Sequence, residues 1–227
     1  MNFLLSFWRS TVGAKVVVAV TGLILLGFTL FHMLGNLQVF LGADEMNTYG
    51  AFLHKPEILW AGRAVVFGSI GLHIVAQAKL VAATAVARPT GYRKWNAKAS
   101  TIYSRTMKYT GPIILIFFVL HLLNLTTGAE FGFYVHPEPY LQDGNVPRAF
   151  ENLTSLLANP LWATFYIVAN LALASHLWHG AFSMTKTLGL SGVRQLRLAR
   201  VIASVFTLAV TGGNIAITTA CVLHLVK

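Results

Sequence analysis

Long apolar stretches alternate along the chain with short connections that hold most of the charged residues. Four of these stretches contain no acidic or basic residue. A fifth contains only Arg63 and Lys79, near its ends, where long cationic side chains reach the membrane surface. Each stretch supplies the roughly 20 residues that cross about 30 Å of hydrocarbon. The pattern predicts an all-α integral membrane bundle of five transmembrane helices, with spans at approximately residues 16–42, 58–87, 109–129, 160–186 and 200–226.

The composition agrees with this pattern and excludes an ordinary soluble domain. Of the 227 residues, 56% are hydrophobic and 11% are charged, and the mean hydropathy is +0.64. We therefore expect one transmembrane domain that covers residues 1–227. The first apolar run is too long for a signal-peptide core and lacks a small-residue cleavage site, so we expect it to remain as the first span.

The distribution of charge predicts the orientation of the bundle. If the N-terminus is cytoplasmic, 13 of the 17 basic residues lie on the inner side. The other four lie on the outer side with all seven acids, which gives that side a net charge of −3. This is the positive-inside pattern, and it accounts for the net charge of +10 without nucleic acid, so we expect no nucleic-acid partner. The inner basic surface suits anionic lipid of the bilayer or an acidic partner protein.

Cysteine contributes almost nothing to the chemistry of this chain. Cys221 is the only one, near the outer end of the last expected span. The sequence therefore excludes a disulfide framework within the chain, a site with several cysteine ligands and the Cys-x-x-Cys-His attachment of covalent haem.

A short phrase occurs in both the first and the third expected span. Thr21-Gly22 is followed, after nine residues, by His32, and Thr110-Gly111 is followed in the same way by His121. Eleven residues make about three helical turns, so the threonine and the histidine of each phrase share a face and lie roughly 16 Å apart. The phrase is a weak internal duplication, in which both the residue types and their positions around the helix repeat.

Histidines of the first four expected spans lie at two depths. Counted at 1.5 Å per residue from the inner basic anchors, His32 and His121 lie about 20 to 25 Å deep, and His73 and His179 about 9 to 10 Å deep. The outer layer therefore pairs His32 with His121, and the inner layer pairs His73 with His179. Because His176 precedes His179 by one helical turn, either residue can serve as the inner ligand.

An intramembrane histidine is costly and seldom lacks a partner, so two pairs at matched depths indicate two shared ligands. Two non-covalent b haems, each held by two axial imidazoles inside a helical bundle, suit this arrangement. With both axial positions filled, the expected role is electron transfer. The alternatives are histidines that bond neighbouring helices and a transporter with a histidine proton relay.

Other polar residues receive simpler interpretations. We expect His54 and His136 to be solvated in outer loops and His224 to lie at the outer interface. Asn36 and Asn124 are expected to form interhelical hydrogen bonds. Thr211-Gly212-Gly213 repeats the Thr-Gly pair without the histidine, which predicts close packing of helices.

These motifs resemble, in their order and spacing, the single-chain dihaem cytochrome b subunit of succinate:quinone oxidoreductases, which are succinate dehydrogenase and fumarate reductase. The resemblance covers nearly the whole chain. It is carried by the five spans and by these motifs: Thr21-Gly22-x9-His32-Met33, Lys55-Pro56 before His73, Ala87-Arg88-Pro89-x-x-Tyr92-Arg93, Thr110-Gly111-x9-His121-Leu122, and His176-Leu177-Trp178-His179-Gly180 with Thr187-Leu188-Gly189.

The resemblance implies a membrane anchor of the bacterial cytoplasmic membrane that serves the respiratory chain and the tricarboxylic acid cycle. Two b haems would carry electrons between an iron-sulfur subunit and menaquinone or ubiquinone, and a higher oligomer of the complex is compatible with this role. Succinate chemistry, FAD and the iron-sulfur clusters would belong to partner subunits on the cytoplasmic face, and this chain would contain no catalytic residue for that chemistry.

The resemblance also bears on individual residues. It favours His179 over His176 as the inner ligand, because the second histidine of His-x-x-His-Gly matches the family ligand. Some relatives carry an acidic residue before the first outer Lys-Pro, and this chain has none there. His54 and Glu57 are the candidate quinone contacts in its place. The rival function within the same broad class is the cytochrome b anchor of a hydrogenase, formate dehydrogenase or nitrate reductase.

Overall fold

The chain folds into five long helices, as the hydrophobic pattern predicts. The computed structural model describes residues 3–88, 90, 100–127, 141–142 and 146–226. Within them, five helical segments are long and apolar enough to cross a membrane, which confirms the expected all-α architecture of five spans. The helices are α2 (Thr11–Asn36), α4 (Pro56–Ala87), α5 (Ile102–Leu125), α7 (Pro160–Thr187) and α8 (Val193–Val222).

Polar side chains and prolines set the beginnings of these helices. The Ser10 hydroxyl accepts a hydrogen bond from the backbone N–H of Gly13 and starts α2, and Thr101 caps α5 in the same way. Pro56 stands at the first position of α4, as expected, and Pro160 at that of α7. Three spans begin five to seven residues earlier than the charge pattern predicts, because α2, α5 and α8 continue past their basic residues.

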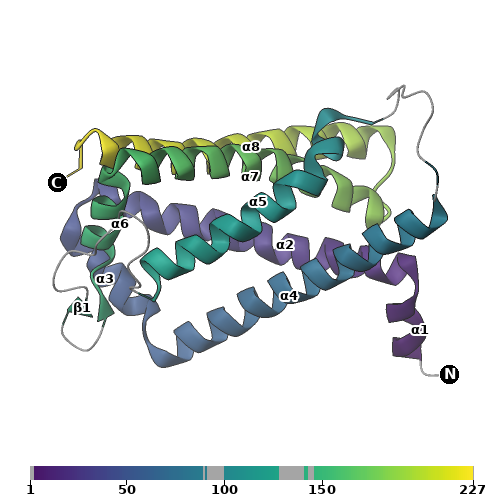
Figure 1. Cartoon of the computed structure of the whole chain (residues 1–227), viewed down its shortest axis with the longest axis horizontal. Coiled ribbons are helices and arrows are strands. Elements are labelled where there is room, and N and C mark those ends of the chain that lie inside the picture. Colours follow the sequence, from purple (N-terminus) through teal and green to yellow (C-terminus); the bar gives the residue numbers. More distant parts are fainter. Residues whose placement is uncertain (1–2, 89, 91–99, 128–140, 143–145, 227) are drawn as a thin grey trace.

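Shorter elements complete the chain at the two ends of the bundle. Figure 1 shows α1 (Phe3–Arg9) and the N-terminus at one end, and α3 (Ala43–Leu53), α6 (Ala149–Ala158) and the C-terminus at the other. We call these the α1 end and the α3–α6 end. A 3-10 turn, η1 (Leu37–Phe40), follows α2, and the two-residue strands β1 (Leu141–Gln142) and β2 (Val146–Pro147) pair antiparallel. The odd number of spans places the two termini at opposite ends.

Four of the long helices surround a common axis. Helix α2 packs against α4 and α7, and α5 packs against α7. The ring centroids of Phe67 on α4 and Phe118 on α5 are 5.9 Å apart, so α4 also contacts α5 and the four helices form a closed circuit. The order around the axis is therefore α2, α4, α5, α7, so that α2 faces α5 across one diagonal and α4 faces α7 across the other.

Helix α8 lies outside this circuit and packs on α7 and α2. The Trp178 indole N–H donates to the Ser204 hydroxyl at 3.0 Å, which joins α7 to its antiparallel neighbour α8. An added Cβ at Gly213 would lie 2.5 Å from the sulfur of Met33, so this glycine lets α8 approach α2. The close packing predicted for the third Thr-Gly pair is thus confirmed at Gly213.

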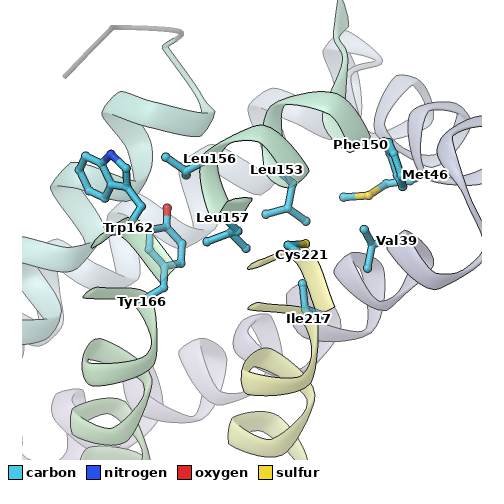
Figure 2. Packing of buried hydrophobic residues seen from close by; sticks show 10 residues of the cluster. All are labelled: Val39, Met46, Phe150, Leu153, Leu156, Leu157, Trp162, Tyr166, Ile217 and Cys221. Atoms are coloured by element: carbon cyan, nitrogen blue, oxygen red, sulfur yellow. The ribbon is translucent and has the colours of Figure 1, made fainter. Parts of the chain in front are cut away.

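The largest buried cluster lies at the α3–α6 end. Helix α6 contributes three buried leucines, Leu153, Leu156 and Leu157, to the centre of this cluster (Figure 2). Helix α6 is therefore part of the core, because its apolar face closes the end of the bundle. The cluster consists of Val39, Met46, Phe150, Leu153, Leu156, Leu157, Trp162, Tyr166, Ile217 and Cys221.

Candidate functional site

Two histidines from opposite helices face each other in the half of the bundle nearer the α3–α6 end. The rings of His32 on α2 and His121 on α5 have centroids 5.7 Å apart and are nearly perpendicular, at 86°. Aromatic rings surround them: Phe28 stacks on His32 at 5.4 Å, and Phe117 and Tyr166 lie 5.6 and 6.0 Å from His121. The structure therefore brings together the two histidines of the duplicated phrase.

Hydrogen bonds hold both of these rings. The Tyr166 hydroxyl lies 3.2 Å from Nδ1 of His121, and Nδ2 of Asn36 donates to Nε2 of His32 at 3.2 Å. Nε2 of His32 therefore carries a lone pair, and a metal ion bound there would take it in place of Asn36. Because Asn36 bonds a residue of its own helix, the prediction of an interhelical hydrogen bond is wrong for this side chain.

A second pair lies one layer toward the α1 end. The rings of His73 on α4 and His176 on α7 have centroids 6.4 Å apart and are inclined at 55°. Each is held at Nδ1 by a threonine: Thr21 at 3.0 Å from His73, and Thr110 at 3.3 Å from His176. Among the described residues, His179 makes no ring contact and no side-chain hydrogen bond, so the structure pairs His73 with His176, the alternative that the sequence left open.

The two pairs use the two diagonals of the helical circuit. We call the pair nearer the α3–α6 end the outer pair, which joins α2 to α5, and the pair nearer the α1 end the inner pair, which joins α4 to α7. Residues on diagonal helices face each other across the bundle axis. Helical bundles commonly build cofactor sites there, from side chains of facing helices. Thr21 lies at the level of His73, and eleven helical residues separate it from His32, so the layers are about 16 Å apart.

The spacing of each pair fits two axial ligands of one metal ion. A metal–imidazole bond is about 2 Å long, so two imidazoles bound in line to one iron hold their ring centroids roughly 6 Å apart. The observed separations of 5.7 and 6.4 Å lie on either side of this value. None of the four rings is fully buried, and His32 is exposed, although each faces another helix of the bundle.

The number of ligands distinguishes haem from a bare metal ion. Structural zinc needs four protein ligands and catalytic zinc three. In the described part of the chain, no group of three or more histidine, cysteine, aspartate or glutamate side chains is placed to hold a metal. Two imidazoles alone suit an iron whose other four ligands come from a macrocycle. The residues present therefore fit two haems of the bis-histidine type.

The hydrogen bonds at Nδ1 add a second feature of metal ligation. A histidine that binds a metal through one nitrogen commonly uses the other for a hydrogen bond that orients the ring. His73, His176 and His121 each have Nδ1 within hydrogen-bond distance of a hydroxyl, which leaves Nε2 for a ligand.

Other candidate residues stand apart from the two pairs. His54 ends α3 and Glu57 lies exposed in the first turn of α4, and neither side chain forms a hydrogen bond with the four histidines. Partial burial, together with the positive charge of Arg63, lowers the pKa of His54. His224 is exposed beyond α8, as expected, and His136 lies outside the described residues.

Sequence reasoning missed three polar contributors to this region. It did not assign Thr21 and Thr110 to the inner rings or Tyr166 to the outer one. It also expected a hydrogen bond for Asn124, whose amide is fully buried and has no hydrogen-bond partner among the described residues. The duplicated Thr-Gly was the available signal for the threonines, whereas nothing in the sequence distinguishes Tyr166 or Asn124 from packing residues.

Comparison with known proteins gives no relative: no family model, no curated protein and no solved structure matches this chain.

Proposed function

We propose that this protein is a membrane-embedded dihaem cytochrome b that carries electrons along the bundle axis. One observation carries the proposal: two histidine pairs, on the two diagonals of one helical circuit, have ring centroids 5.7 and 6.4 Å apart. His32 and His121 hold the outer haem, and His73 and His176 hold the inner one. When bound, each haem supplies a one-electron couple between ferric and ferrous iron.

The other residues of the site orient and shield these ligands. Tyr166 and the two threonines bond the ring nitrogens that face away from the ligand. Phe28 stacks on His32 and Phe117 lies beside His121, which adds apolar surface around the outer rings. Because two histidines would hold each haem, the group would supply electron transfer and not substrate binding.

The motif resemblance extends this proposal to a particular complex. We infer that the chain is the membrane anchor of a succinate:quinone oxidoreductase in a bacterial cytoplasmic membrane, with its N-terminus in the cytoplasm. A flavoprotein and an iron-sulfur protein would dock on the basic cytoplasmic surface, and menaquinone or ubiquinone would react at the bundle. His54 and Glu57, both at the α3–α6 end, are the proposed quinone contacts.

The test begins with purification of the full chain from membranes of a host that supplies haem. A pyridine haemochrome assay is expected to give two b haems per chain. A reduced-minus-oxidised spectrum is expected to show the α bands of both haems. His32→Ala or His121→Ala is expected to leave one haem, the inner one. His73→Ala or His176→Ala is expected to leave the outer one.

His224→Ala is the matched control, because that histidine is exposed beyond the last helix and is expected to leave both haems in place. Circular dichroism and gel filtration of each variant separate loss of a ligand from loss of the fold. A folded, colourless wild-type protein would overturn the proposal. Copurification of a covalent flavoprotein would support the succinate:quinone assignment, and a nickel or molybdenum partner would contradict it.

A further inference from the structure

The hydroxyl of Thr21 contacts an acceptor and an imidazole at the same time. Its Oγ1 lies 2.7 Å from the backbone oxygen of Val17, one turn earlier on α2, and 3.0 Å from Nδ1 of His73 on α4. A hydroxyl has a single proton, and a carbonyl oxygen only accepts. The shortest of these distances assigns the Thr21 proton to the oxygen of Val17, and Nδ1–H of His73 then donates to the Thr21 hydroxyl.

This assignment determines the tautomer of His73. A neutral imidazole carries one proton, so when Nδ1 holds it, Nε2 has a free lone pair. Only that nitrogen can then bind a metal ion from this ring. Thr21 also holds the ring at a definite rotation, since the hydrogen bond joins two helices at one point.

Thr110 occupies the corresponding place on α5. Its Oγ1 lies 3.3 Å from Nδ1 of His176, and its acceptors on the preceding turn are the backbone oxygen of Met107 at 3.5 Å and the sulfur of the same residue at 4.0 Å. By analogy with Thr21, the Thr110 hydroxyl is assigned as the acceptor of Nδ1–H from His176, which leaves Nε2 of His176 free. Both inner rings thus have the same nitrogen, Nε2, free for a ligand.

We infer that Thr21 and Thr110 are positioning residues that fix the inner histidines in the Nδ1–H tautomer, so that each Thr-Gly-x9-His phrase serves both layers. The histidine of the phrase ligates the outer haem, and its threonine orients a ligand of the inner haem on the neighbouring helix. The part that concerns ligation rests on the proposed function, whereas the tautomer assignment does not. The duplication is therefore a repeated two-layer unit.

The outer rings obtain their hydrogen bonds from residues outside the phrase. Tyr166 on α7 bonds His121, and Asn36 bonds His32. Replacement of either threonine therefore acts on the inner layer alone. A ligand imidazole that donates from Nδ1 is a stronger base, and loss of such a partner commonly lowers metal affinity by about 10-fold to 100-fold. A stronger base also favours ferric over ferrous iron, so its loss raises the midpoint potential.

The first experiment measures the tautomer directly in the full chain. The ring nitrogens of ¹⁵N-labelled histidine are observed by NMR in lipid nanodiscs, with the protein reduced wherever haem is present. The His73 signals are assigned by difference with His73→Ala. Wild type is expected to show protonated Nδ1. Thr21→Val, which is isosteric but lacks the hydroxyl, is expected to lose that state, and Thr21→Ser is expected to restore it.

Thr29→Val is the matched control. Thr29 donates to the backbone oxygen of Leu25 at 2.7 Å on the same helix, as Thr21 does to Val17, but within the described part of the chain it has no hydrogen bond to a histidine. Its replacement is expected to leave the His73 nitrogens unchanged. An equal change in both variants would mean that the helix, not the hydroxyl, sets the tautomer, and this would overturn the inference.

The second experiment measures each haem by potentiometric titration with optical spectra. Thr21→Val and Thr110→Val are expected to raise the midpoint of the inner haem and to weaken its retention by about tenfold or more, while the outer haem keeps both properties. A serine at either position is expected to restore wild-type values. Equal shifts in both haems, or no shift in either, would overturn the inference. If wild type binds no haem, the proposed function fails, and the NMR result still decides the tautomer.

Discussion

The side chains of Asn214 and Asn170 join α8 to α7 by a hydrogen bond of 2.8 Å, in which Nδ2 of Asn214 donates to Oδ1 of Asn170. Asn170 donates in turn to the backbone oxygen of Tyr166 at 2.9 Å, which fixes its amide. The hydroxyl of Tyr166 contacts Nδ1 of His121. Helix α8, which contributes no residue to either histidine pair, is thereby connected to the outer pair.

Asn214→Leu is expected to lower the free energy of unfolding by about 1 kcal/mol, because hydrogen bonds between membrane helices average about 0.6 kcal/mol and reach about 1.7. Asn170→Leu is expected to cost somewhat more, since it also removes the bond to Tyr166. The measurement is unfolding in mixed detergent micelles, followed by circular dichroism. If the two amides act as a pair, the double variant costs less than the two single variants together, and strict additivity would contradict the coupling.

Gly213 and Gly212 provide a neighbouring pair for a test of packing. A Cβ at Gly213 would meet the sulfur of Met33 at 2.5 Å, and Met33 is itself buried, so Gly213→Ala is expected to cost about 1 to 3 kcal/mol as overpacking. Nothing lies within 4 Å of a Cβ at Gly212. Gly212→Ala is therefore expected to be neutral or to stabilise the helix by up to about 1 kcal/mol.

The same detergent unfolding assay compares the two alanine variants. Because Met33 follows His32 directly, Gly213→Ala is also expected to change the spectrum of the outer haem, whereas Gly212→Ala leaves it unchanged. Equal stability of the two variants would show that α8 and α2 do not approach each other as closely as the structure places them.

Much of the fold was predictable because a membrane restricts the possible structures. Every backbone polar group in hydrocarbon must be bonded within its own segment, so length and apolarity alone predict the five helices. The same rule explains why their beginnings were placed late. Charged residues such as Arg105 and Lys108 mark the membrane surface, not the end of the helix, and α5 extends beyond both to its cap at Thr101.

The site was predictable in part for a similar reason. Depth along a helix follows from a constant rise per residue, and this was enough to place His32 at the level of His121. The choice between His176 and His179 depends instead on the rotation of α7 about its axis. That rotation is set by packing against α5 and α8, and one sequence contains no measure of it. The roles of Tyr166 and Asn124 depend on the same contacts.

The carboxylate of Glu151 joins α6 to α3 outside the membrane spans. It accepts hydrogen bonds from Asn47 at 3.0 Å and from Arg148 at 3.0 Å. Burial acts to raise the pKa of Glu151, but the hydrogen bonds from Asn47 and Arg148 outweigh it, and the net result is a pKa below the ordinary 4.5. A lowered pKa stabilises the fold above about pH 4.5, and this contribution is lost as the pH falls through the folded-state value.

The thermal midpoint of the wild-type protein is therefore expected to fall as the pH decreases from about 5 to 3, by an amount that reflects less than about 1 kcal/mol for a partly exposed group. Glu151→Gln is expected to be less stable near neutral pH and to show a flatter profile. Glu57→Gln, which changes an exposed carboxylate, serves as the control and keeps the wild-type slope. A Glu151→Gln profile parallel to that of wild type would exclude this linkage.

Asn124 is a buried amide whose two polar atoms have no partner among the described residues. An unsatisfied buried polar group costs about 1 to 3 kcal/mol. Asn124→Leu, which keeps the branched shape and removes the amide, is expected to raise the free energy of unfolding by about 1 kcal/mol in the detergent assay. A fall in the free energy of unfolding would contradict this prediction and would indicate that the amide has a partner in the native protein.

The last prediction concerns the choice between two histidines one turn apart on α7. The ring of His176 lies 6.4 Å from that of His73 and is held by Thr110, whereas His179 makes no ring contact among the described residues. His176→Ala is therefore expected to remove the inner haem and to spare the outer one. His179→Ala is expected to retain both, with a midpoint potential of the inner haem close to that of wild type.

The pyridine haemochrome count of the full chain decides between the two residues, and exogenous imidazole sharpens the result. Imidazole can occupy the cavity left by His176→Ala and is expected to restore part of the low-spin inner-haem spectrum. It is expected to have no effect on His179→Ala, since no ligand is missing there. The opposite pattern would make His179 the ligand, as the motif resemblance favours. It would also mean that α7 is rotated, relative to this structure, by the roughly 60° that separates the two side chains.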